Sequence, residues 1–372
     1  MDRPIGARRS RREGCFVECY HGGMVKEKWI KDLKPLFLIL GLQVLMAARG
    51  CCAVLGLSED GHRFTLDGKE TFLMGISYYG ALSAEDPEVW AKDLQELRRD
   101  GVNWIRVWAY WQFPKDNGEN VSVMERDGSI REALMQKLED LVASCDELGI
   151  VVDVTLFRDA STSGVGPPDM AAHTQACLNI ARRLLPCRNV YVDVANERDV
   201  RDGRYVSLEE CGELIRCIKS VDPKRLCTAS CMPVSLDQLS AIMNIARVDL
   251  LAPHLCRHQG CADRTQETVK GTLEWMRSIE KTVPIHLQEP FRRGYGNYEP
   301  EVDDFLRDLA GAVRGGAAGW CFHNGAQQGD RPFRSFSLAS SEGRLYEQLD
   351  ASELAVLSKM KGVAASVPSE LR

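Results

Sequence analysis

The sequence predicts a single (β/α)8 TIM barrel, an α/β fold in which eight parallel strands each precede a helix. Short apolar runs with strand character alternate strictly with amphipathic helical patterns between residues 58 and 362. Such alternation indicates a parallel sheet. There are eight runs of each kind, and eight units in roughly 300 residues suit a closed barrel. Because no linker or internal repeat marks a second domain, we expect residues 58–362 to form one barrel domain.

An open, doubly wound sheet is the alternative arrangement. It would normally carry a glycine-rich G-x-G-x-x-G turn directly after its first strand. The first predicted strand leads instead into GISYYG at residues 75–80, which lacks that pattern. The barrel is therefore favoured over the open sheet.

The individual elements follow from local patterns, beginning with a short hairpin. Residues 63–72 read RFTLDGKETF, in which Asp67-Gly68 is typical of a two-residue hairpin turn. The helix at 86–99 has clear end signals, because Asp86 suits an N-cap, Pro87 suits the first turn and Gly101 follows the end. Strands are expected at 72–76, 104–107, 150–154, 190–194, 226–230, 250–253, 285–288 and 319–322. Helices are expected at 86–99, 130–148, 170–185, 208–221, 236–246, 265–281, 300–313 and 345–360.

Residues 1–50 have the pattern of a leader rather than of barrel sequence. The run PLFLILGLQVLMAA at 35–48 is uncharged and mostly apolar, lysines precede it and small residues follow it. This order is typical of a secretory signal, and 14 residues are too few to span a bilayer comfortably. Met24 would be a natural start for it. We therefore expect a secreted or cell-envelope protein. A membrane anchor that continues through Arg49 to Leu57, and a buried core helix, are the alternatives.

Charge is unevenly distributed along the chain. The net charge is −6 over 372 residues, and residues 1–50 contain ten basic and five acidic side chains. The remaining residues therefore carry −11. An acidic body without a basic stripe argues against a nucleic-acid partner. The sequence does not indicate an oligomeric state.

The 14 cysteines do not have the spacing of a structural zinc site, since no C-x-x-C pair is present. Export would permit disulfides. A pair within one predicted helix, such as Cys211 and Cys217, or within one predicted strand, such as Cys227 and Cys231, is held too far apart to bond. The pair Cys256/Cys261 lies in one predicted loop and is the one nearby pair that is a candidate for a disulfide, whereas the sequence leaves the disulfide pairing open.

Polar side chains follow the predicted strands where each strand ends, which is where the active site of such a barrel lies. The carboxylates of Glu197, after the fourth strand, and Glu289, after the seventh, would face each other across the barrel mouth. Paired carboxylates that flank a scissile bond are what glycoside cleavage requires. Further candidates on the strand ends are Tyr79, Arg106, Trp108, Asn196, His254, Trp320 and His323. Asp153 and Asp159 have no convergent ligands beside them, so no metal is expected.

Asn196-Glu197 at the end of VYVDVANE and Glu289 in HLQEPF resemble glycoside hydrolase clan A, the retaining (β/α)8 glycosidases. In outline the chain is most similar to the cellulases and mannanases of family 5, over about residues 62–340. The resemblance implies a hydrolase without a cofactor that cleaves a β-linked oligo- or polysaccharide by double displacement. By the same resemblance Glu197 is the acid/base and Glu289 the nucleophile.

The resemblance also implies roles for side chains around the two carboxylates. Asn196 would bind the 2-hydroxyl of the sugar, and Arg106 would keep the nucleophile charged. His254 matches the histidine of the sixth strand, and Trp320 matches a tryptophan platform on the eighth. Trp108, Tyr79 and His323 would also line the substrate site.

Two departures from the family pattern leave an alternative open. Cys256 stands where the family often has a tyrosine that bonds to the nucleophile, and the usual extra histidine near the fourth strand has no match. A barrel that binds glycan without cleaving it is therefore the second hypothesis, and a metal-dependent hydrolase is the third. Asn196-Glu197 also fits a helix N-cap, and Glu289 also fits a rim ion pair with Arg292 or Arg293.

The mechanism sets electrostatic expectations for the two carboxylates. Glu197 must start protonated, so we expect burial and the charge of Glu289 to raise its pKa. Glu289 must be ionised, and Arg106 is the side chain expected to hold it so. A retaining enzyme places the two carboxyl groups about 5–5.5 Å apart, whereas a separation beyond about 6.5 Å indicates inversion.

Overall fold

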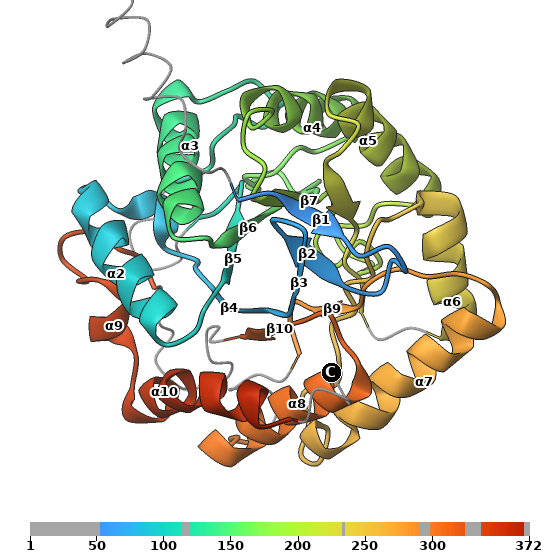
Figure 1. Cartoon of the computed structure of the whole chain (residues 1–372). Helices are drawn as coiled ribbons and strands as arrows, with labels where there is room; N and C mark the ends of the chain where they lie inside the picture. The colour runs from blue at the N-terminus through green and yellow to red at the C-terminus, as the bar shows by residue number, and fades with distance from the viewer. Residues whose placement is uncertain (1–52, 113–119, 233–234, 291–297, 324–335, 368–372) are drawn as a thin grey trace, which may run out of the picture. The chain divides into compact units, whose positions relative to one another are not determined.

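Parallel strands form the wall of the predicted (β/α)8 barrel (Figure 1). The computed structural model describes residues 53–112, 120–232, 235–290, 298–323 and 336–367, so the leader lies outside the described residues. Within them, seven strands make one sheet in the order β8-β7-β6-β5-β4-β10-β9. Their bounds are β4 Leu73–Ser77, β5 Trp104–Trp108, β6 Val151–Thr155, β7 Val190–Asp193, β8 Leu226–Thr228, β9 His286–Leu287 and β10 Gly319–Phe322.

The predicted strand at 250–253 lies between β8 and β9 but is reduced to single parallel bridges. Cys231 is bridged to Pro253, and Leu251 is bridged to Ile285. Pro253 and Pro284 have no N–H to donate, which limits the ladder on this side. The two bridges nevertheless close the barrel.

Helices surround the sheet in the expected alternation. In α2 the side chain of Asp86 accepts a hydrogen bond from the backbone N–H of Glu88 at 2.9 Å, as its N-cap role predicts. The predicted helix at 345–360 is divided, because Asp350 starts a new helix with its own capping box. The bounds are η1 Ala81–Ser83, α2 Pro87–Arg99, α3 Glu132–Glu147, α4 Met170–Arg183, α5 Leu208–Val221, α6 Leu236–Ala241, η2 Ile242–Ala246, η3 Ala262–Arg264, α7 Thr265–Ser278, α8 Val302–Gly315, α9 Leu345–Gln348 and α10 Ala351–Ser366.

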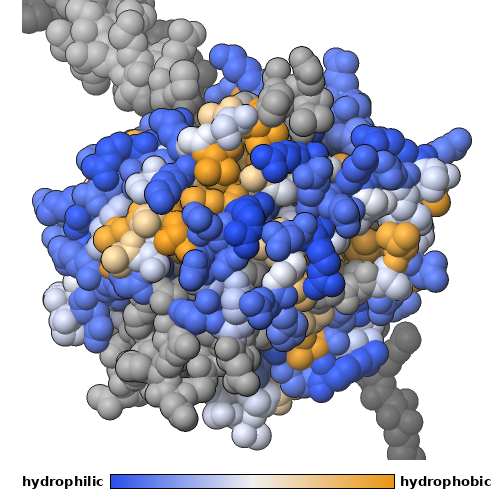
Figure 2. All heavy atoms as spheres, turned by 90° about the horizontal axis from the view of Figure 1, so that it is seen from below, coloured by the Kyte–Doolittle hydropathy of each residue, from blue (hydrophilic) through white to orange (hydrophobic). Residues whose placement is uncertain are grey.

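The helices bury one face and expose the other. Figure 2 views the molecule from the lower side of Figure 1, where α8 and α10 lie, and shows a mostly hydrophilic surface with separate hydrophobic areas. Among the described residues, no helix is both long and apolar enough to cross a bilayer.

The predicted hairpin covers the N-terminal end of the barrel. β2 (Phe64–Leu66) pairs antiparallel with β3 (Lys69–Thr71), and β1 (Leu55–Leu57) pairs with β2. Asp67 and Gly68 have φ of 55° and 76°, which a two-residue turn of this kind requires. Phe64 stacks on Tyr191 inside the barrel, with ring centroids 6.3 Å apart. The opposite end of the barrel is where the polar strand ends converge.

The barrel interior is layered, apolar near the hairpin and polar above it. Inward-facing residues of the lower layer are Leu73, Trp104, Val151, Tyr191, Leu226 and Leu250. Two residues further along their strands, Arg106 and Asp153 are paired neighbours in register, and both are fully buried. Side chains alternate along a strand, so this second layer brings charge to the centre of the barrel. A buried charge requires a partner, and the site is built on these pairs.

Candidate active site

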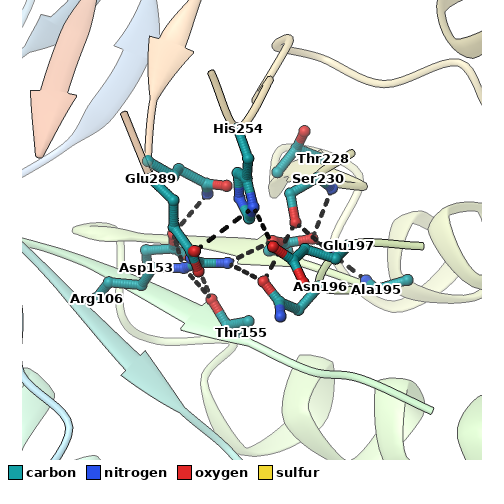
Figure 3. A network of polar contacts seen from close by, with 12 residues as sticks. Arg106, Asp153, Thr155, Ala195, Asn196, Glu197, Thr228, Ser230, His254 and Glu289 are labelled. Atoms are coloured by element: carbon teal, nitrogen blue, oxygen red, sulfur yellow. Dashed lines mark hydrogen bonds and ion pairs between the residues drawn. The ribbon is translucent and has the colours of Figure 1, made fainter. Parts of the chain in front are cut away.

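The two glutamates predicted from the strand ends lie together at the C-terminal end of the barrel, with His254 between them (Figure 3). Glu197 follows β7 and Glu289 follows β9. One ligand atom from each of Glu197, His254 and Glu289 can be chosen so that all lie within 4.8 Å of one another. The segments that carry them are far apart in sequence, so the closed barrel brings the carboxylates together.

Arg106 is the centre of the network beneath the glutamates. Its Nη1 donates to Oε1 of Glu289 at 2.6 Å. Its Nη2 donates to Asn196 Oδ1 at 2.8 Å and to Asp193 Oδ2 at 3.0 Å. Its Nε donates to Thr155 Oγ1 at 2.9 Å. An arginine inside an apolar strand needs buried anions, and the structure supplies Glu289, as predicted, together with Asp193.

Asp153 is a further carboxylate next to Arg106, and its environment raises its pKa. The closest contact between the two side chains is 3.4 Å, and Gln288 Nε2 donates to Asp153 Oδ2 at 2.6 Å. Burial raises the pKa of Asp153 to about 7, with a further contribution from Asp193, although the charge of Arg106 lowers it. Asp153 is therefore part of the support beneath the site and can carry a proton near neutral pH.

Glu289 is buried, with 5% of its surface exposed, and basic side chains surround its carboxylate. Its Oε2 lies 2.8 Å from Arg257 Nη2, 3.3 Å from His323 Nε2 and 3.6 Å from His254 Nδ1. Burial raises the pKa of Glu289, but the charges of His254, His323, Arg106 and Arg257 lower it well below its usual range. Glu289 is thus ionised, as the sequence analysis expected.

Glu197 has a different environment. The backbone of Glu197 is in the left-handed region, with φ of 46°, and its N–H donates to Ser230 Oγ at 3.0 Å. In the side chain of Glu197, Oε1 lies 3.2 Å from His254 Nδ1. On the other side Arg204 Nη1 donates to its Oε2 at 2.7 Å. A left-handed backbone conformation is uncommon for a residue other than glycine. At Glu197 it occurs in a residue whose two carboxylate oxygens both have a partner.

The prediction of a raised pKa for Glu197 is wrong in this structure. Burial and the charge of Glu289 do raise it, as expected. The hydrogen bond with His254 and the charges of His254 and Arg204 outweigh them, and the net pKa is lowered. Arg204 was missed because it lies in the loop after the strand; the charge-rich run ERDVRDGR at 197–204 was the available signal.

Aromatic residues gather on the Glu289 side of the site. The rings of Tyr79 and Trp108 stack with centroids 4.7 Å apart, and the guanidinium of Arg106 lies 4.6 Å from the Trp108 ring. The hydroxyl of Tyr79 lies 3.2 Å from His323 Nε2. Trp111 packs against Tyr79 and Trp108 and is only partly buried. The structure therefore joins the predicted residues Tyr79, Trp108 and His323 to the site.

Trp320 does not belong to this group, so its interpretation as a sugar platform is corrected. It is fully buried, and its Nε1 donates to Asp308 Oδ2 of α8 at 2.6 Å. The alternation along β10 turns Cys321 into the barrel and leaves Trp320 facing the helices. Trp320 is part of the packing between sheet and helix.

The described residues contain one set of side chains with metal-ligand geometry, Glu197, His254 and Glu289. Guanidinium groups already contact its carboxylates: Arg204 is paired with Glu197, and Arg106 and Arg257 are paired with Glu289. A cation at this position would be repelled by these arginines. The charges therefore favour a carboxylate pair over a metal site.

The candidate disulfide Cys256–Cys261 is present, with Cα atoms 5.8 Å apart. Cys211, Cys217, Cys227 and Cys231 are free, as their spacing predicted. Arg257, directly after Cys256, is a site residue that the sequence reasoning missed. Its signal was its position beside Cys256, which stands where the family that the sequence resembles often has a tyrosine.

No protein-family model and no curated protein matches the sequence. Solved structures share the fold at low identity. The chain is similar to a glycoside hydrolase family 5 mannosidase from Rhizomucor miehei, with a TM-score of 0.61, 13% identity and coverage of 85% of this chain and 99% of that one. It is also similar to the β-mannanase of the blue mussel Mytilus edulis, with a TM-score of 0.55 and 13% identity. That match covers 85% of this chain and 98% of the mannanase. A third similar structure is GH5_18 from Streptomyces cattleya, solved with GlcNAc, with a TM-score of 0.55 and 15% identity. That match covers 80% of this chain and 82% of the other. At this identity the similarity establishes the fold.

Proposed function

We propose that this protein is a retaining glycoside hydrolase that cleaves a β-linked oligo- or polysaccharide. The observation that carries the proposal is the pair Glu197 and Glu289, whose oxygens approach within 4.8 Å. A retaining mechanism uses carboxyl groups about 5–5.5 Å apart, and an inverting one needs about 6.5–9.5 Å to admit a water. The close approach supports retention.

In the proposed reaction Glu289 attacks the anomeric carbon while the bond to the leaving oxygen breaks. Glu197 transfers its proton to that oxygen, and a glycosyl ester on Glu289 results. A water then attacks the ester, Glu197 takes the proton of that water, and Glu289 leaves as a carboxylate. Arg106 stabilises the charge of Glu289 before and after the cycle. Asn196, held by Arg106, is positioned to bind a sugar hydroxyl.

The hydrogen bond with His254 and the ion pair with Arg204 add a pH requirement to this cycle. Because the pKa of Glu197 is lowered, the free protein carries Glu197 as a carboxylate near neutral pH. The first step needs the protonated form. We therefore expect kcat/KM to be highest on the acidic side of neutral and to fall as the pH rises through the pKa of Glu197.

The solved structures support a carbohydrate substrate, since similar barrels are described as a mannosidase and a mannanase and one is bound to GlcNAc. Export to an oxidising compartment is supported by the leader pattern at 1–50 and by the Cys256–Cys261 disulfide. A membrane tether through the leader is the alternative. N-terminal sequencing of the protein recovered from the medium and from the membrane fraction distinguishes the two.

Trapping of the covalent intermediate tests the function directly. A panel of activated 2-fluoroglycosides should inactivate the protein and add one sugar mass to the peptide that contains Glu289. Glu289→Ala should remove the label, while Glu274→Ala, an exposed glutamate of α7, should keep it. Absence of labelling together with retained glycan binding would replace the hydrolase with a glycan-binding barrel.

A further inference from the structure

A second arginine contacts the proposed nucleophile, through the oxygen that Arg106 does not bind. Arg257 is only 5% exposed, and its Nη2 donates to Glu289 Oε2 at 2.8 Å. The same nitrogen lies 3.9 Å from Oε1 of Glu197. One guanidinium therefore contacts both proposed catalytic carboxylates.

Arg257 lies within a loop that a disulfide closes. Cys256 and Cys261 are bonded, and the segment between them contains no helix or strand. The loop has a turn in which the N–H of Cys261 donates to the carbonyl of His258 at 3.0 Å, and Gly260 supplies a φ of 78°. Because Cys256 directly precedes Arg257, fixing Cys256 limits the positions that the guanidinium can reach.

We propose that Arg257 is a positioning residue for Glu289 and that the Cys256–Cys261 disulfide holds it there, so that full activity requires the oxidised loop. This inference rests on the proposed function. It assigns a role to the loop at the position where Cys256 replaces a tyrosine.

The geometry explains why one arginine is insufficient. Arg106 Nη1 holds Oε1 of Glu289 at 2.6 Å, which leaves Oε2 to the residues above it. Arg257 is closer to Oε2 than His323, at 3.3 Å, or His254, at 3.6 Å. Charge-assisted hydrogen bonds at both oxygens fix the rotation of the carboxylate, and a nucleophile reacts fast only when its attacking oxygen is correctly aimed.

The disulfide contributes by restricting a flexible support. A long arginine side chain on an irregular loop loses much conformational freedom when it is buried, and a cross-link reduces the freedom that must be lost. Reduction would add two electrons and two protons, taken from a dithiol reductant that becomes a disulfide, and would give two separate thiols. Arg257 would then keep its charge but lose its fixed position.

The charged groups that face Glu289 come from several segments. Among the described residues they are Arg106 from β5, Glu197 after β7, His254 and Arg257 from the loop after the Cys231–Pro253 bridge, and His323 after β10. Without Arg257, the repulsion from Glu197 remains and one cation at Oε2 is lost. The carboxyl of Glu289 should therefore titrate at a higher pH.

Arg257→Met, which keeps much of the side-chain length, is the first test. We expect kcat on aryl glycosides to fall on the order of 10- to 100-fold, with a smaller change in KM. In Arg257→Met the acid limb of the pH profile should move to higher pH. In Arg257→Lys, which keeps the charge, the acid limb should lie close to its wild-type position. Arg277→Met, an exposed arginine of α7, is the matched control.

The disulfide is tested with the Cys256→Ser/Cys261→Ser double variant and with dithiothreitol on the wild type. The double variant and the reduced wild type should both have a lower kcat, as Arg257→Met should. Reductant should have no effect on the double variant. Cys217→Ser, which removes a free cysteine, should keep the response of the wild type to reductant. Circular dichroism confirms folding. Because the reductant acts on protein that has already folded, a variant that fails to fold does not leave the inference untested.

The failures of the two proposals can be distinguished. Absence of Glu289 labelling in the wild type rejects the proposed function. An NMR titration of the 13C-labelled Glu289 carboxyl needs no turnover, and an unchanged pKa in Arg257→Met rejects the role of Arg257. Wild-type kinetics in both the double variant and the reduced protein reject the role of the disulfide.

Discussion

Glu289 and Glu197 face each other at one end of the barrel, but the protein holds them by different means. The carboxylate of Glu289 is buried and contacts Arg106, which is a fully buried residue of β5. The side chain of Glu197 is 12% exposed, and its partner Arg204 is 33% exposed. Arg204 comes from the same loop as Glu197 and is also paired with Asp202, at 2.9 Å.

The difference matches the different tasks of the two carboxylates in a retaining reaction. One must remain charged, and a buried ion pair that other charges surround is costly to break. The other must gain and lose a proton, and an ion pair near the surface contributes little free energy. We infer that buried cations from the barrel core and from the Cys256–Cys261 loop keep Glu289 charged. The charge of Glu197 depends instead on His254 and on the exchangeable contact with Arg204.

The largest expected effect is the loss of the proposed nucleophile. Glu289→Ala should lower kcat/KM by at least on the order of 10⁴-fold, because Glu289 is the group proposed to form the glycosyl intermediate. Turnover of an aryl glycoside measures it. If Glu289→Ala retained more than a tenth of the wild-type activity, the proposed division of roles between Glu289 and Glu197 would be wrong.

Glu197→Gln should have a smaller effect that depends on the leaving group. An unactivated glycan needs the proton, so its kcat should fall by roughly 10²–10⁴-fold. A dinitrophenyl glycoside needs none in the first step and should accumulate the covalent intermediate, which appears as a burst of dinitrophenol. Equal losses with both substrates would contradict the acid/base assignment.

Arg106→Met should affect stability as well as activity, which distinguishes the core side of the site from the loop side. It removes the buried cation from Asp193 and one of the two arginines paired with Glu289, and breaking such a network costs about 3–5 kcal/mol. Urea unfolding at neutral pH measures the loss. Arg204→Gln is the matched substitution on the loop side, and its expected loss is at most about 1 kcal/mol. Equal losses would remove the distinction.

The smallest effect is a shift of the pH profile. Arg204 lowers the pKa of Glu197, so Arg204→Gln should raise that pKa and move the alkaline limb of kcat/KM to higher pH. Asp202→Asn should move the limb the other way, since it removes a competing anion from Arg204. Each shift should be about one unit or less, because the arginine is partly exposed. Shifts of the same sign would contradict this account.

Local patterns were sufficient for the hairpin and for the glutamates. Asp67-Gly68 can form its turn without distant help, and Glu197 and Glu289 follow apolar runs whose ends can be read directly. The position of Arg106 inside such a run already required a buried anion. These features depend on residues that are close in sequence or on the number of strands, and both can be read from the sequence.

The sequence also contained a signal about Trp320 that the family resemblance obscured. Trp320 and His323 are three residues apart near the end of one strand, so alternation does not allow both to point inward. His323 contacts Glu289, and Trp320 packs toward α8. Only the register of β10 in the closed barrel decided which of the two joined the site.

By itself, the sequence determined the barrel, the hairpin, the paired carboxylates and the arginine beneath them. The tertiary structure decided the partners: Arg257 on Glu289, Arg204 on Glu197, and Asp193 beside Arg106. It also decided the sign of the Glu197 pKa shift, which sequence reasoning predicted wrongly. The reason is that strand and turn patterns arise from neighbours along the chain, whereas a pKa reflects all nearby charges in space, and those are brought together only when the barrel closes.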